Sequence, residues 1–387
     1  SPSRGALLFG LGRGQGGDRA TRAATRRLKR YAMKKISDLF VPVTATLREV
    51  LMRSEKTRRG IVLVIDDQER LLGVVTDGDI RRAFLSGTDQ ALPVRTMLNA
   101  KVGGPQPITA PAGSSHGQLV ALLRETGISH VPLVDGEHKV VGLVSLDDLL
   151  EEDETTLQAV VMAGGRGTRL HPLTEDMPKP MLPVGDRPLM ERIIQQLSEA
   201  GIHQVSVTTH FRAEKISEHF GDGRGFGVDM NYIAEDRQLG TASGLALMPE
   251  SESTLLVVNG DILTEMDFRV MQSFHREHRA ALTIAVRQYD VQVPYGVVES
   301  EGVLVRRLVE KPVHKFFVNA GIYLLEPEVH RLIPKGIHFD MTDLIREAME
   351  RGMTVVSFPI WEYWRDIGQH QDYVQAQADI KNGTLSK

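Results

Sequence analysis

Residues 157–170 read LQAVVMAGGRGTRL, an apolar run that leads directly into a glycine-rich loop. The run Leu157–Ala163 has the length and the branched side chains of a buried strand. Glycines that follow a first strand let backbone N–H groups come close to a phosphate and bind it. The loop is neither a Walker P-loop, which needs Gly-Lys-Ser/Thr, nor a dinucleotide loop, which needs a third glycine before a helix. The sequence therefore predicts a phosphate-binding loop of another kind.

A proline-rich segment follows the loop and contains Lys179. Three prolines around this lysine predict a stiff, extended segment that holds the ammonium group in a fixed place. A helix is predicted from Pro188, with Gly201 as its end. Its predicted buried face consists of Leu189, Ile193, Ile194 and Leu197.

Apolar strands alternate with amphipathic helices through the rest of the chain, which predicts a mostly parallel α/β sheet covered on both faces. The segment 255–261, LLVVNGD, is predicted to be a buried strand that leads to a carboxylate, Asp261. Open α/β sheets bind their ligands at the carboxyl ends of the strands. Asp261 is therefore a candidate site residue.

The stretch Gly164–Pro180 resembles the signature of the sugar-1-phosphate nucleotidyltransferases, Gly-Gly-x-Gly-Thr-Arg-Leu-x-Pro-Leu-Thr followed by Pro-Lys-Pro. Ser243 departs from the family, which commonly has a second glycine there. The resemblance covers residues 156 to about 380. It implies a catalytic domain at residues 156–381 with a Rossmann-like mixed, mostly parallel sheet, the nucleotide-diphospho-sugar transferase fold. Further motifs follow in the family's order: LGTA (239–242), YGVV (295–298), VEKP (309–312), VNAGIY (318–323), FDMTDLI (339–345) and WRDIG (364–368).

The resemblance also implies roles for particular residues. The implied catalytic residues are Arg169, Lys179 and Asp261. The resemblance also implies a Mg²⁺ site formed by Asp261 and Asp366. Arg169 would stabilise the departing phosphates, and Lys179 would hold the α-phosphate region. The implied nucleotide-binding residues are Ala163, Gly164, Gly165, Gly167, Thr168, Gly240 and Thr241. The implied sugar-phosphate-binding residues are Tyr295, Gly296, Glu310, Lys311 and Asn319.

The predicted activity joins a nucleoside triphosphate to a hexose-1-phosphate and releases pyrophosphate, for the synthesis of surface glycans. The LGTA loop resembles guanylyltransferases, so GTP with mannose-1-phosphate or glucosamine-1-phosphate is the leading prediction. Few residues follow Asp366, which disfavours the uridylyl enzymes that carry an added β-helix domain. Transfer of a thymidylyl or uridylyl group to glucose-type sugar phosphates remains an alternative. A catalytically silent, nucleotide-sensing protein is a second alternative.

Residues 33–153 contain an internal repeat at an offset of 69 residues. Ile61–Ile80 and His130–Leu149 each read as two strands and a helix, and Gly73 corresponds to Gly142. The repeat resembles an α+β tandem cystathionine-β-synthase (CBS) pair, which implies a regulatory role and two clefts. In ligand-binding pairs the Thr and Asp of the signature hold an adenine nucleotide, but the same residues also cap helices. The candidate positions are Thr76, Asp79, Ser145 and Asp148.

Composition limits the remaining possibilities. The chain of 387 residues has a formal charge of −4, but residues 1–32 hold eight basic residues and one acidic residue. We expect this +7 segment to be a disordered extension, a remnant upstream of Met33, and not a nucleic-acid site. The absence of cysteine excludes disulfides and thiolate chemistry. No apolar run is long enough to span a membrane. With no cysteine and no secretory segment, we predict a cytoplasmic protein, and we separately expect a homo-oligomer.

Overall fold

The structure, a computed structural model, describes residues 36–57, 59–100, 106–145, 157–237 and 240–385. The chain divides into two compact units, one made of residues 1–83 and 87–152 and the other of residues 84–86 and 153–387. The predicted extension and Asp148 lie outside the described residues. No helix in the described ranges combines the length and the apolar content that a membrane crossing requires.

The first unit contains two three-stranded sheets, in the orders β1-β2-β3 and β4-β5-β6. Its strands are β1 (Phe40–Pro42), β2 (Ile61–Ile65), β3 (Leu71–Thr76), β4 (Ala110–Pro111), β5 (His130–Val134) and β6 (Val140–Ser145). Its helices are η1 (Ile36–Leu39), α2 (Leu47–Thr57), α3 (Asp77–Leu85), α4 (Val94–Ala100) and α5 (His116–Thr126). The equal order of the two sheets matches the predicted repeat.

The two repeats share a core, in which Leu63 and Leu71 of the first lie with Val140 and Leu143 of the second. The predicted helix of the first repeat is α3, which follows β3 directly. Thr76 caps this helix, because its Oγ1 accepts a hydrogen bond from Asp79 N at 3.2 Å.

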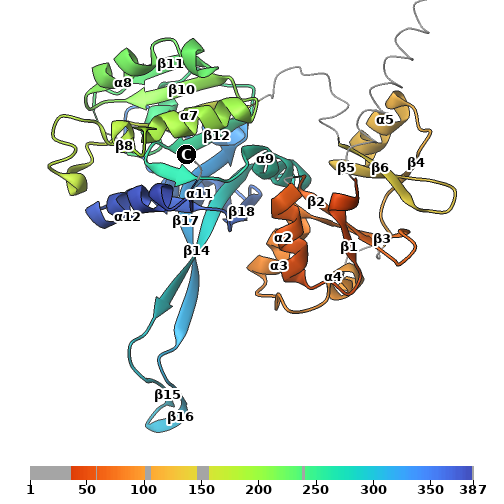
Figure 1. Ribbon diagram of the computed structural model, residues 1–387. Helices are drawn as coiled ribbons and strands as arrows, with labels where there is room; N and C mark the ends of the chain where they lie inside the picture. Colours follow the sequence, from red (N-terminus) through yellow and green to blue (C-terminus); the bar gives the residue numbers. More distant parts are fainter. Residues whose placement is uncertain (1–35, 58, 101–105, 146–156, 238–239, 386–387) are drawn as a thin grey trace, which may run out of the picture. The chain divides into compact units, whose positions relative to one another are not determined.

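The second unit is built on a seven-stranded sheet in the order β11-β10-β7-β12-β17-β14-β18 (Figure 1). Its strands are β7 (Gln158–Met162), β10 (Gln204–Thr209), β11 (Asp229–Ala234), β12 (Leu255–Asn259), β14 (Leu282–Gln292), β17 (Val313–Leu325) and β18 (Val355–Ile360). Only β17 runs antiparallel to its neighbours, β12 and β14. The sheet is therefore mixed and mostly parallel, as predicted.

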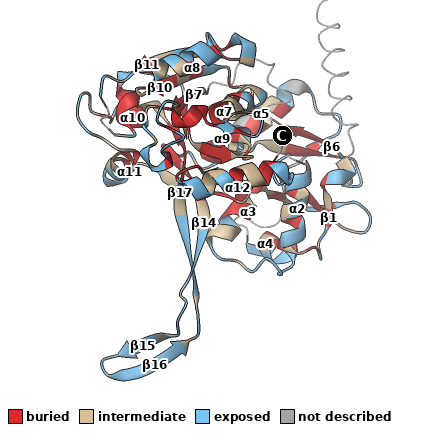
Figure 2. Ribbon diagram, turned by 60° about the vertical axis from the view of Figure 1, so that its left-hand side comes forward, coloured by how far each residue is buried: buried red, intermediate tan, exposed pale blue. Residues whose placement is uncertain are grey.

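Helices cover both faces of this sheet. The helices are α7 (Leu189–Glu199), α8 (Ala213–Phe220), α9 (Phe268–Glu277), α10 (Pro327–His330), α11 (Met341–Glu350) and α12 (His370–Lys381). Because side chains alternate along a strand, Val161 of β7 joins the core with α7, α8 and α9. Val160 points to the other face of the sheet, where it joins the second core with α10 and α11. Figure 2 shows the buried residues concentrated in this layered part.

Shorter elements join and extend the layers. They are the strands β8 (Pro183–Val184), β9 (Arg187–Pro188), β13 (Ile262–Thr264), β15 (Val297–Glu301), β16 (Leu304–Val309) and β19 (Trp364–Asp366), and the 3₁₀ helices η2 (Thr168–Leu170), η3 (Lys179–Met181), η4 (Arg224–Phe226) and η5 (Ser243–Leu247).

One local prediction was wrong. The segment around Lys179 is a tight turn, η3, rather than extended chain, because Met181 N donates to Pro178 O at 2.8 Å. Proline is compatible with the first turn of a helix, where its missing N–H is not needed. The loop at Gly240 leads to the 3₁₀ helix η5.

Candidate active site

The carboxyl edge of the sheet gathers the residues that the sequence predicted to be catalytic. β7 and β12 are parallel neighbours, so the glycine loop after β7 and Asp261 after β12 emerge side by side. Gly260 N donates to Met162 O at 2.9 Å, which fixes this spacing. The sequence thus places two separate loops at one edge, because parallel strands end together.

A short antiparallel pair brings the second aspartate to the first. Ile262 of β13 lies opposite Asp366 of β19, and Ile367 N donates to Asp261 O at 3.0 Å. Trp364 anchors β19 to the main sheet through a hydrogen bond from its Nε1 to Ala320 O at 2.9 Å. Two carboxylates more than 100 residues apart in the sequence therefore lie together.

Lys179 lies between these two carboxylates. Its Nζ is 2.5 Å from Asp261 Oδ2 and 3.8 Å from Asp366 Oδ1. The lysine side chain is 9% exposed, whereas those of Asp261 and Asp366 are 26% and 48% exposed. Burial and the negative charge of Asp261 raise the pKa of Asp366, against the lowering effect of Lys179 and Arg169. The site is an open pair of acidic groups with one ammonium group at its floor.

The glycine loop provides donors for an anion. In the described part of the chain, no acceptor is found for the backbone N–H groups of residues 165–168. Arg169 follows them on η2 and is close enough to act on the charge of Asp366. Gly167 has φ +63°, and a Cβ there would lie 3.1 Å from the Cβ of Lys179. The loop backbone therefore packs directly on the lysine. Ala163 differs, since its N–H already donates to Thr208 O.

The second predicted nucleotide-binding loop is held by the start of α11. Thr241 N donates to Asp340 Oδ1 at 2.7 Å, and Thr241 Oγ1 accepts from Met341 N at 2.9 Å. Gly240 has φ +106° and packs against Phe339 O. Leu239 of this loop lies outside the described residues. The segment 339–345 thus positions residues 240–241.

Sequence reasoning missed Glu235, which follows β11 at the same edge of the sheet. Its Oε1 would lie 3.0 Å from a Cβ at Gly164 and 2.9 Å from one at Gly244. The carboxylate is therefore enclosed by the first glycine loop and by η5. Burial raises its pKa, while Thr208 and His210 act in the opposite direction. A carboxylate directly after a strand was the signal that could have found it, as it found Asp261.

Asn259 was also missed as a candidate. It ends β12 two residues before Asp261, and its buried Oδ1 has no donor within the described residues. Its amide lies against Gly321, where a Cβ would be 2.6 Å from Asn259 Nδ2.

The predicted sugar-phosphate residues separate into two groups. Asn319 lies on β17 within the main sheet, where its Oδ1 accepts a hydrogen bond from Gly321 N at 3.0 Å. Tyr295, Gly296, Glu310 and Lys311 lie together on the ribbon that extends β14 and β17, where Lys311 N donates to Tyr295 O. No interaction within the described ranges joins these four to Lys179, Asp261 or Asp366.

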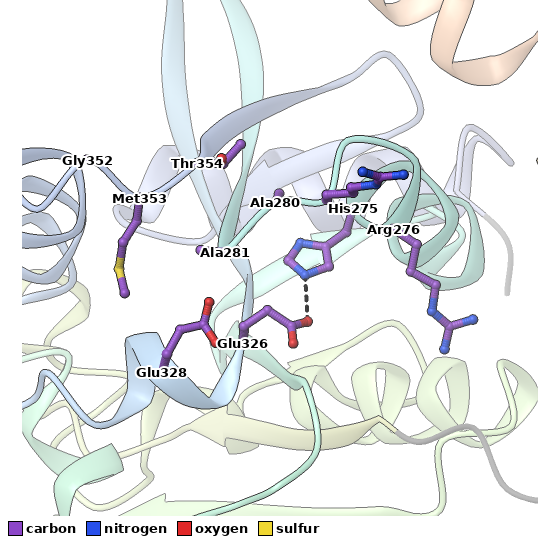
Figure 3. A pocket seen from close by; sticks show the side chains of 10 residues that line it. His275, Arg276, Ala280, Ala281, Glu326, Glu328, Gly352, Met353 and Thr354 are labelled. Carbon is purple, nitrogen blue, oxygen red and sulfur yellow. Dashed lines mark hydrogen bonds and ion pairs between the residues drawn. The ribbon is translucent and has the colours of Figure 1, made fainter. Parts of the chain in front are cut away.

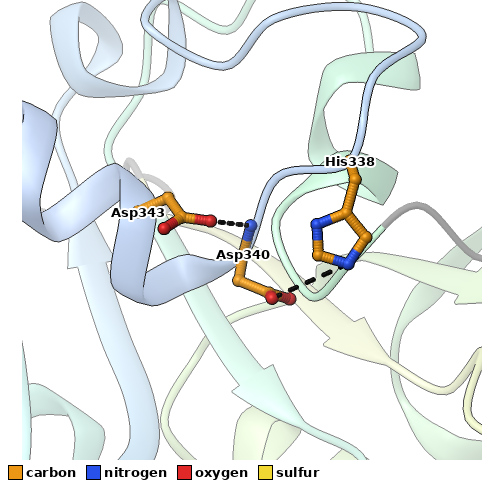
Figure 4. A group of neighbouring side chains, drawn as sticks. All are labelled: His338, Asp340 and Asp343. Atoms are coloured by element: carbon orange, nitrogen blue, oxygen red, sulfur yellow. Dashed lines mark hydrogen bonds and ion pairs between the residues drawn. The ribbon is translucent and has the colours of Figure 1, made fainter.

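A group of possible metal ligands elsewhere is explained by helix capping. His338, Asp340 and Asp343 offer ligand atoms within 4.8 Å of one another (Figure 4). Asp340 and Asp343 form the capping box of α11, and Asp340 also holds Thr241. We therefore assign this group to structure.

A hollow at the amino edge of the sheet is also structural (Figure 3). His275 is buried there, and both its ring nitrogens have partners: Thr283 Oγ1 at 2.7 Å and Glu326 Oε1 at 2.9 Å. Thr254 Oγ1 donates to the same Glu326 oxygen. Burial lowers the pKa of His275, although Glu326 opposes the shift.

Asp261 and Asp366 fit a hard divalent cation, because such ions bind few carboxylates and fill their remaining positions with water and phosphate oxygens. Both side chains are reachable from solvent; Asp261 directly precedes β13, and Asp366 ends β19, the strand that pairs with β13.

Comparison with known families agrees with this arrangement. A family model described as nucleotidyl transferase matches residues 158–383, and the CBS domain model matches residues 30–86 and 101–154. The chain therefore belongs to the nucleotidyl transferase family and carries tandem CBS domains, as the sequence motifs indicated.

The curated relatives include two activities. The chain is 30% identical over 236 residues to a mannose-1-phosphate guanylyltransferase of Mycobacterium tuberculosis, covering 59% of this chain and 65% of that protein. It is 34% identical over 256 residues to a UTP–glucose-1-phosphate uridylyltransferase of Synechocystis, covering 58% and 65%. The chain thus spans just under two thirds of these relatives. Among solved structures, HddC from Yersinia pseudotuberculosis aligns with a TM-score of 0.46 and 24% identity over 57% of this chain and 98% of that one.

Proposed function

We propose that this protein is a sugar-1-phosphate nucleotidyltransferase, which makes a nucleotide sugar and pyrophosphate from a nucleoside triphosphate and a hexose-1-phosphate. The observation that carries the proposal is the cluster of Lys179, Asp261 and Asp366 beside the glycine loop. The reaction must bring two crowded anions together, so charge neutralisation and alignment supply most of the acceleration. A catalytically silent relative would be expected to lack at least one of these groups or Arg169.

In the proposed reaction a sugar-phosphate oxygen attacks the α-phosphorus. The new P–O bond forms as the bond to the β-phosphate bridging oxygen breaks, and pyrophosphate leaves with that electron pair. The N–H groups of residues 165–168, for which the described residues offer no acceptor, bind phosphate oxygens, and Arg169 stabilises the charge of the leaving group. The attacking phosphate is already an anion, so no protein nucleophile is needed, and the lack of cysteine is no obstacle.

We infer that Asp261 and Asp366 hold Mg²⁺. When bound, Mg²⁺ neutralises phosphate charge and orients phosphate oxygens. Lys179 contributes a buried positive charge at the floor of the same site, which offsets part of the charge of the two carboxylates and meets the α-phosphate.

GTP is the proposed nucleotide, and Glu235 supports this choice. A carboxylate only accepts hydrogen bonds, and the guanine edge offers two adjacent donors, N1–H and the N2 amino group. Uracil and thymine offer a single N–H between two acceptors, which a carboxylate satisfies less well. Glu235 is enclosed by the first glycine loop, at Gly164, and by η5, at Gly244, which directly follows the second loop assigned to the nucleotide.

The proposed sugar is mannose-1-phosphate or glucosamine-1-phosphate, for surface glycans. The named activity of the M. tuberculosis relative supports mannose, and that of the Synechocystis relative keeps UTP with glucose-1-phosphate as the second candidate.

A matrix of triphosphates and sugar phosphates, scored by pyrophosphate release with Mg²⁺, tests the proposal. We expect GTP with mannose-1-phosphate or glucosamine-1-phosphate to give the highest rate. Highest rates with UTP and glucose-1-phosphate would favour the second candidate. No pyrophosphate from any pair would contradict the enzyme assignment.

We further propose that the CBS pair, residues 33–153, regulates the catalytic domain at residues 156–381 by binding an adenine nucleotide. In the first repeat Asp79 accepts from Thr76 and Arg82, so a ribose has to compete with these bonds. Ser145 lies at the equivalent end of β6. Millimolar AMP or ATP should raise the melting temperature, and Asp79→Ala should reduce the shift. A purely structural pair would show no shift at all.

A further inference from the structure

A histidine beside the glycine loop has one ring nitrogen with a partner and one without. His210 directly follows β10, and its Nδ1 lies 2.8 Å from the backbone oxygen of Glu235. A carbonyl oxygen only accepts hydrogen bonds, so Nδ1 carries the proton and donates it. In the neutral ring Nε2 is then an acceptor. Within the described residues no group donates to this Nε2.

His210 shares its surroundings with the Glu235 carboxylate. A Cβ at Gly164 would lie 3.0 Å from Glu235 Oε1 and 3.6 Å from the Cβ of His210, so both residues flank the start of the glycine loop. Burial raises the pKa of Glu235, and the nearby His210 opposes this shift. No ion pair joins the two side chains in the described chain. They therefore present two separate acceptors beside the same glycine.

The order of the strands ranks these groups along the carboxyl edge of the sheet. β11, β10, β7 and β12 are parallel neighbours in that order. Glu235 follows β11, His210 follows β10, the glycine loop follows β7, and Asp261 comes after β12. Neighbouring strands are about 4.8 Å apart, so this row spans roughly 14 Å. A nucleotide that lies along it, with its phosphates at the loop and its base edge at Glu235, has the sugar side of its base at His210.

Guanine has one more donor than Glu235 satisfies. The carboxylate accepts from N1–H and from one hydrogen of the N2 amino group. The other amino hydrogen points to the sugar side of the base, the edge that faces the minor groove in a duplex. His210 Nε2 is an acceptor on that side, between Glu235 and the phosphate loop. Uracil and thymine carry no amino group, so an acceptor here favours guanine over both.

A purely structural role is the alternative, and a second histidine on the same strand shows what that role requires. His203 precedes β10, and its Nδ1 lies 2.9 Å from the backbone oxygen of Gly227, two residues before β11. It joins the amino ends of β10 and β11 as His210 joins their carboxyl ends. His203 is exposed to water, whereas His210 is partly buried beside the glycine loop. Joining the strands uses Nδ1 of both residues but leaves Nε2 of His210 without a role.

We propose that His210 is a specificity-determining residue, whose Nε2 accepts a hydrogen bond from the N2 amino group of guanine. The inference rests on the proposed function and adds a second base contact to the one proposed for Glu235. The two residues together satisfy all the donors on the N1 and N2 edge of guanine. The bond from Nδ1 to Glu235 O keeps the proton on Nδ1, which holds the ring in the tautomer whose Nε2 accepts.

Inosine triphosphate (ITP) tests this contact, because its base is guanine without the N2 amino group. His210→Asn retains a donor near the position of Nδ1 and removes Nε2. His210→Gln retains an acceptor near the position of Nε2. His210→Asn should lower the ratio of kcat/KM for GTP to that for ITP about 3- to 10-fold, the effect of one hydrogen bond, by slowing the reaction with GTP alone. His210→Gln should keep most of the ratio.

The ratio separates a base contact from the alternatives. A strand contact, or a bond from Nε2 to the ribose, affects both nucleotides alike. An unchanged ratio in His210→Asn, with or without an equal loss of both rates, would therefore overturn the proposal. His203→Asn is the matched control, because His203 makes the same kind of bond at the other end of β10. It should leave both rates unchanged.

Binding provides a readout that does not depend on turnover. Calorimetric titration of the full-length chain with GTP and with ITP, in Mg²⁺ and without sugar phosphate, gives the two Kd values. His210→Asn should reduce the preference for GTP in Kd as it does in kcat/KM. If wild type binds GTP but releases no pyrophosphate from any substrate pair, the proposed function alone fails, and the Kd values still decide the role of His210. A wild type that binds neither nucleotide, or both equally, would overturn the inference.

Discussion

Asp261 and Asp366 are held together by backbone: the carbonyl of Asp261 accepts a hydrogen bond from the residue that follows Asp366, Ile367, at 3.0 Å. The pairing of β13 with β19 therefore sets the distance between the two carboxylates, independently of any ion between them. Tyr363, Arg365 and Asp379 secure β19 to α12, since Tyr363 OH donates to Asp379 Oδ2 at 2.6 Å.

Asp261→Asn should lower the rate of pyrophosphate release by at least about 10³-fold, because it removes a charge that acts at the reacting phosphates. The melting temperature should change little, since the side chain is partly exposed. Asp229→Asn is the matched control, because Asp229 forms only a surface pair with Arg224. Near wild-type turnover of Asp261→Asn would contradict the assigned role.

Gly167→Ala should destabilise the protein by about 1–2 kcal/mol, because a Cβ is disfavoured at φ +63° and would press on Lys179 and Thr174. Gly165→Ala should leave stability unchanged, since nothing lies within 4 Å of a Cβ there. Denaturant unfolding of the two variants measures the difference. Equal stabilities would mean that the loop backbone does not pack against Lys179 as described.

Glu235→Gln should reduce kcat/KM for GTP by about 10- to 100-fold, the effect of one or two hydrogen bonds to a charged acceptor. The ratio of UTP to GTP activity should rise, because an amide offers one donor and one acceptor, as the uracil edge requires. Steady-state kinetics with both nucleotides measure this ratio. An unchanged ratio would show that Glu235 does not contact the base. Glu252→Gln, on the exposed surface, is the control.

Stability should fall as the pH drops below about 6.5, in part because of His275. Burial lowers the pKa of His275 in the folded chain, so the unfolded chain, with a pKa near 6.5, binds the proton first. The contribution of neutral His275 to the free energy of unfolding is therefore complete above about pH 6.5. It is lost as the pH falls toward the lower pKa that His275 has in the folded chain. Urea unfolding at pH 7.5 and 5.5 should show a smaller difference for His275→Gln than for wild type. An equal difference in both proteins would contradict this account.

Thr76→Ala should lower stability by about 0.5–2 kcal/mol, because Thr76 Oγ1 caps α3 through Asp79 N. Thr57→Ala is a useful control, since that hydroxyl bonds only carbonyls at the end of α2. Thermal unfolding without nucleotide separates this structural effect from any effect on ligand binding. A Thr76→Ala variant as stable as wild type would mean that the cap contributes nothing.

Local sequence patterns were enough to predict the strand and loop at residues 157–170, the helix at Leu189–Glu199 and the repeat of the first unit. These features depend on local chemistry: side-chain periodicity, glycine in a tight loop and hydroxyl caps. Arg169, Lys179 and Asp261 were found for the same reason, since each lies in a contiguous motif or at a strand end.

The contacts between groups that are distant in the sequence could be read only from the folded chain. Asp366 reaches Asp261 through a two-stranded pair, and Glu235 reaches the glycine loop because β11, β10 and β7 are neighbours in the sheet. The order of strands in a sheet depends on long-range pairing, which local periodicity does not encode. For the same reason the motifs at Tyr295 and Glu310 were recognisable in the sequence, whereas their place on an extended ribbon, apart from Lys179, was not.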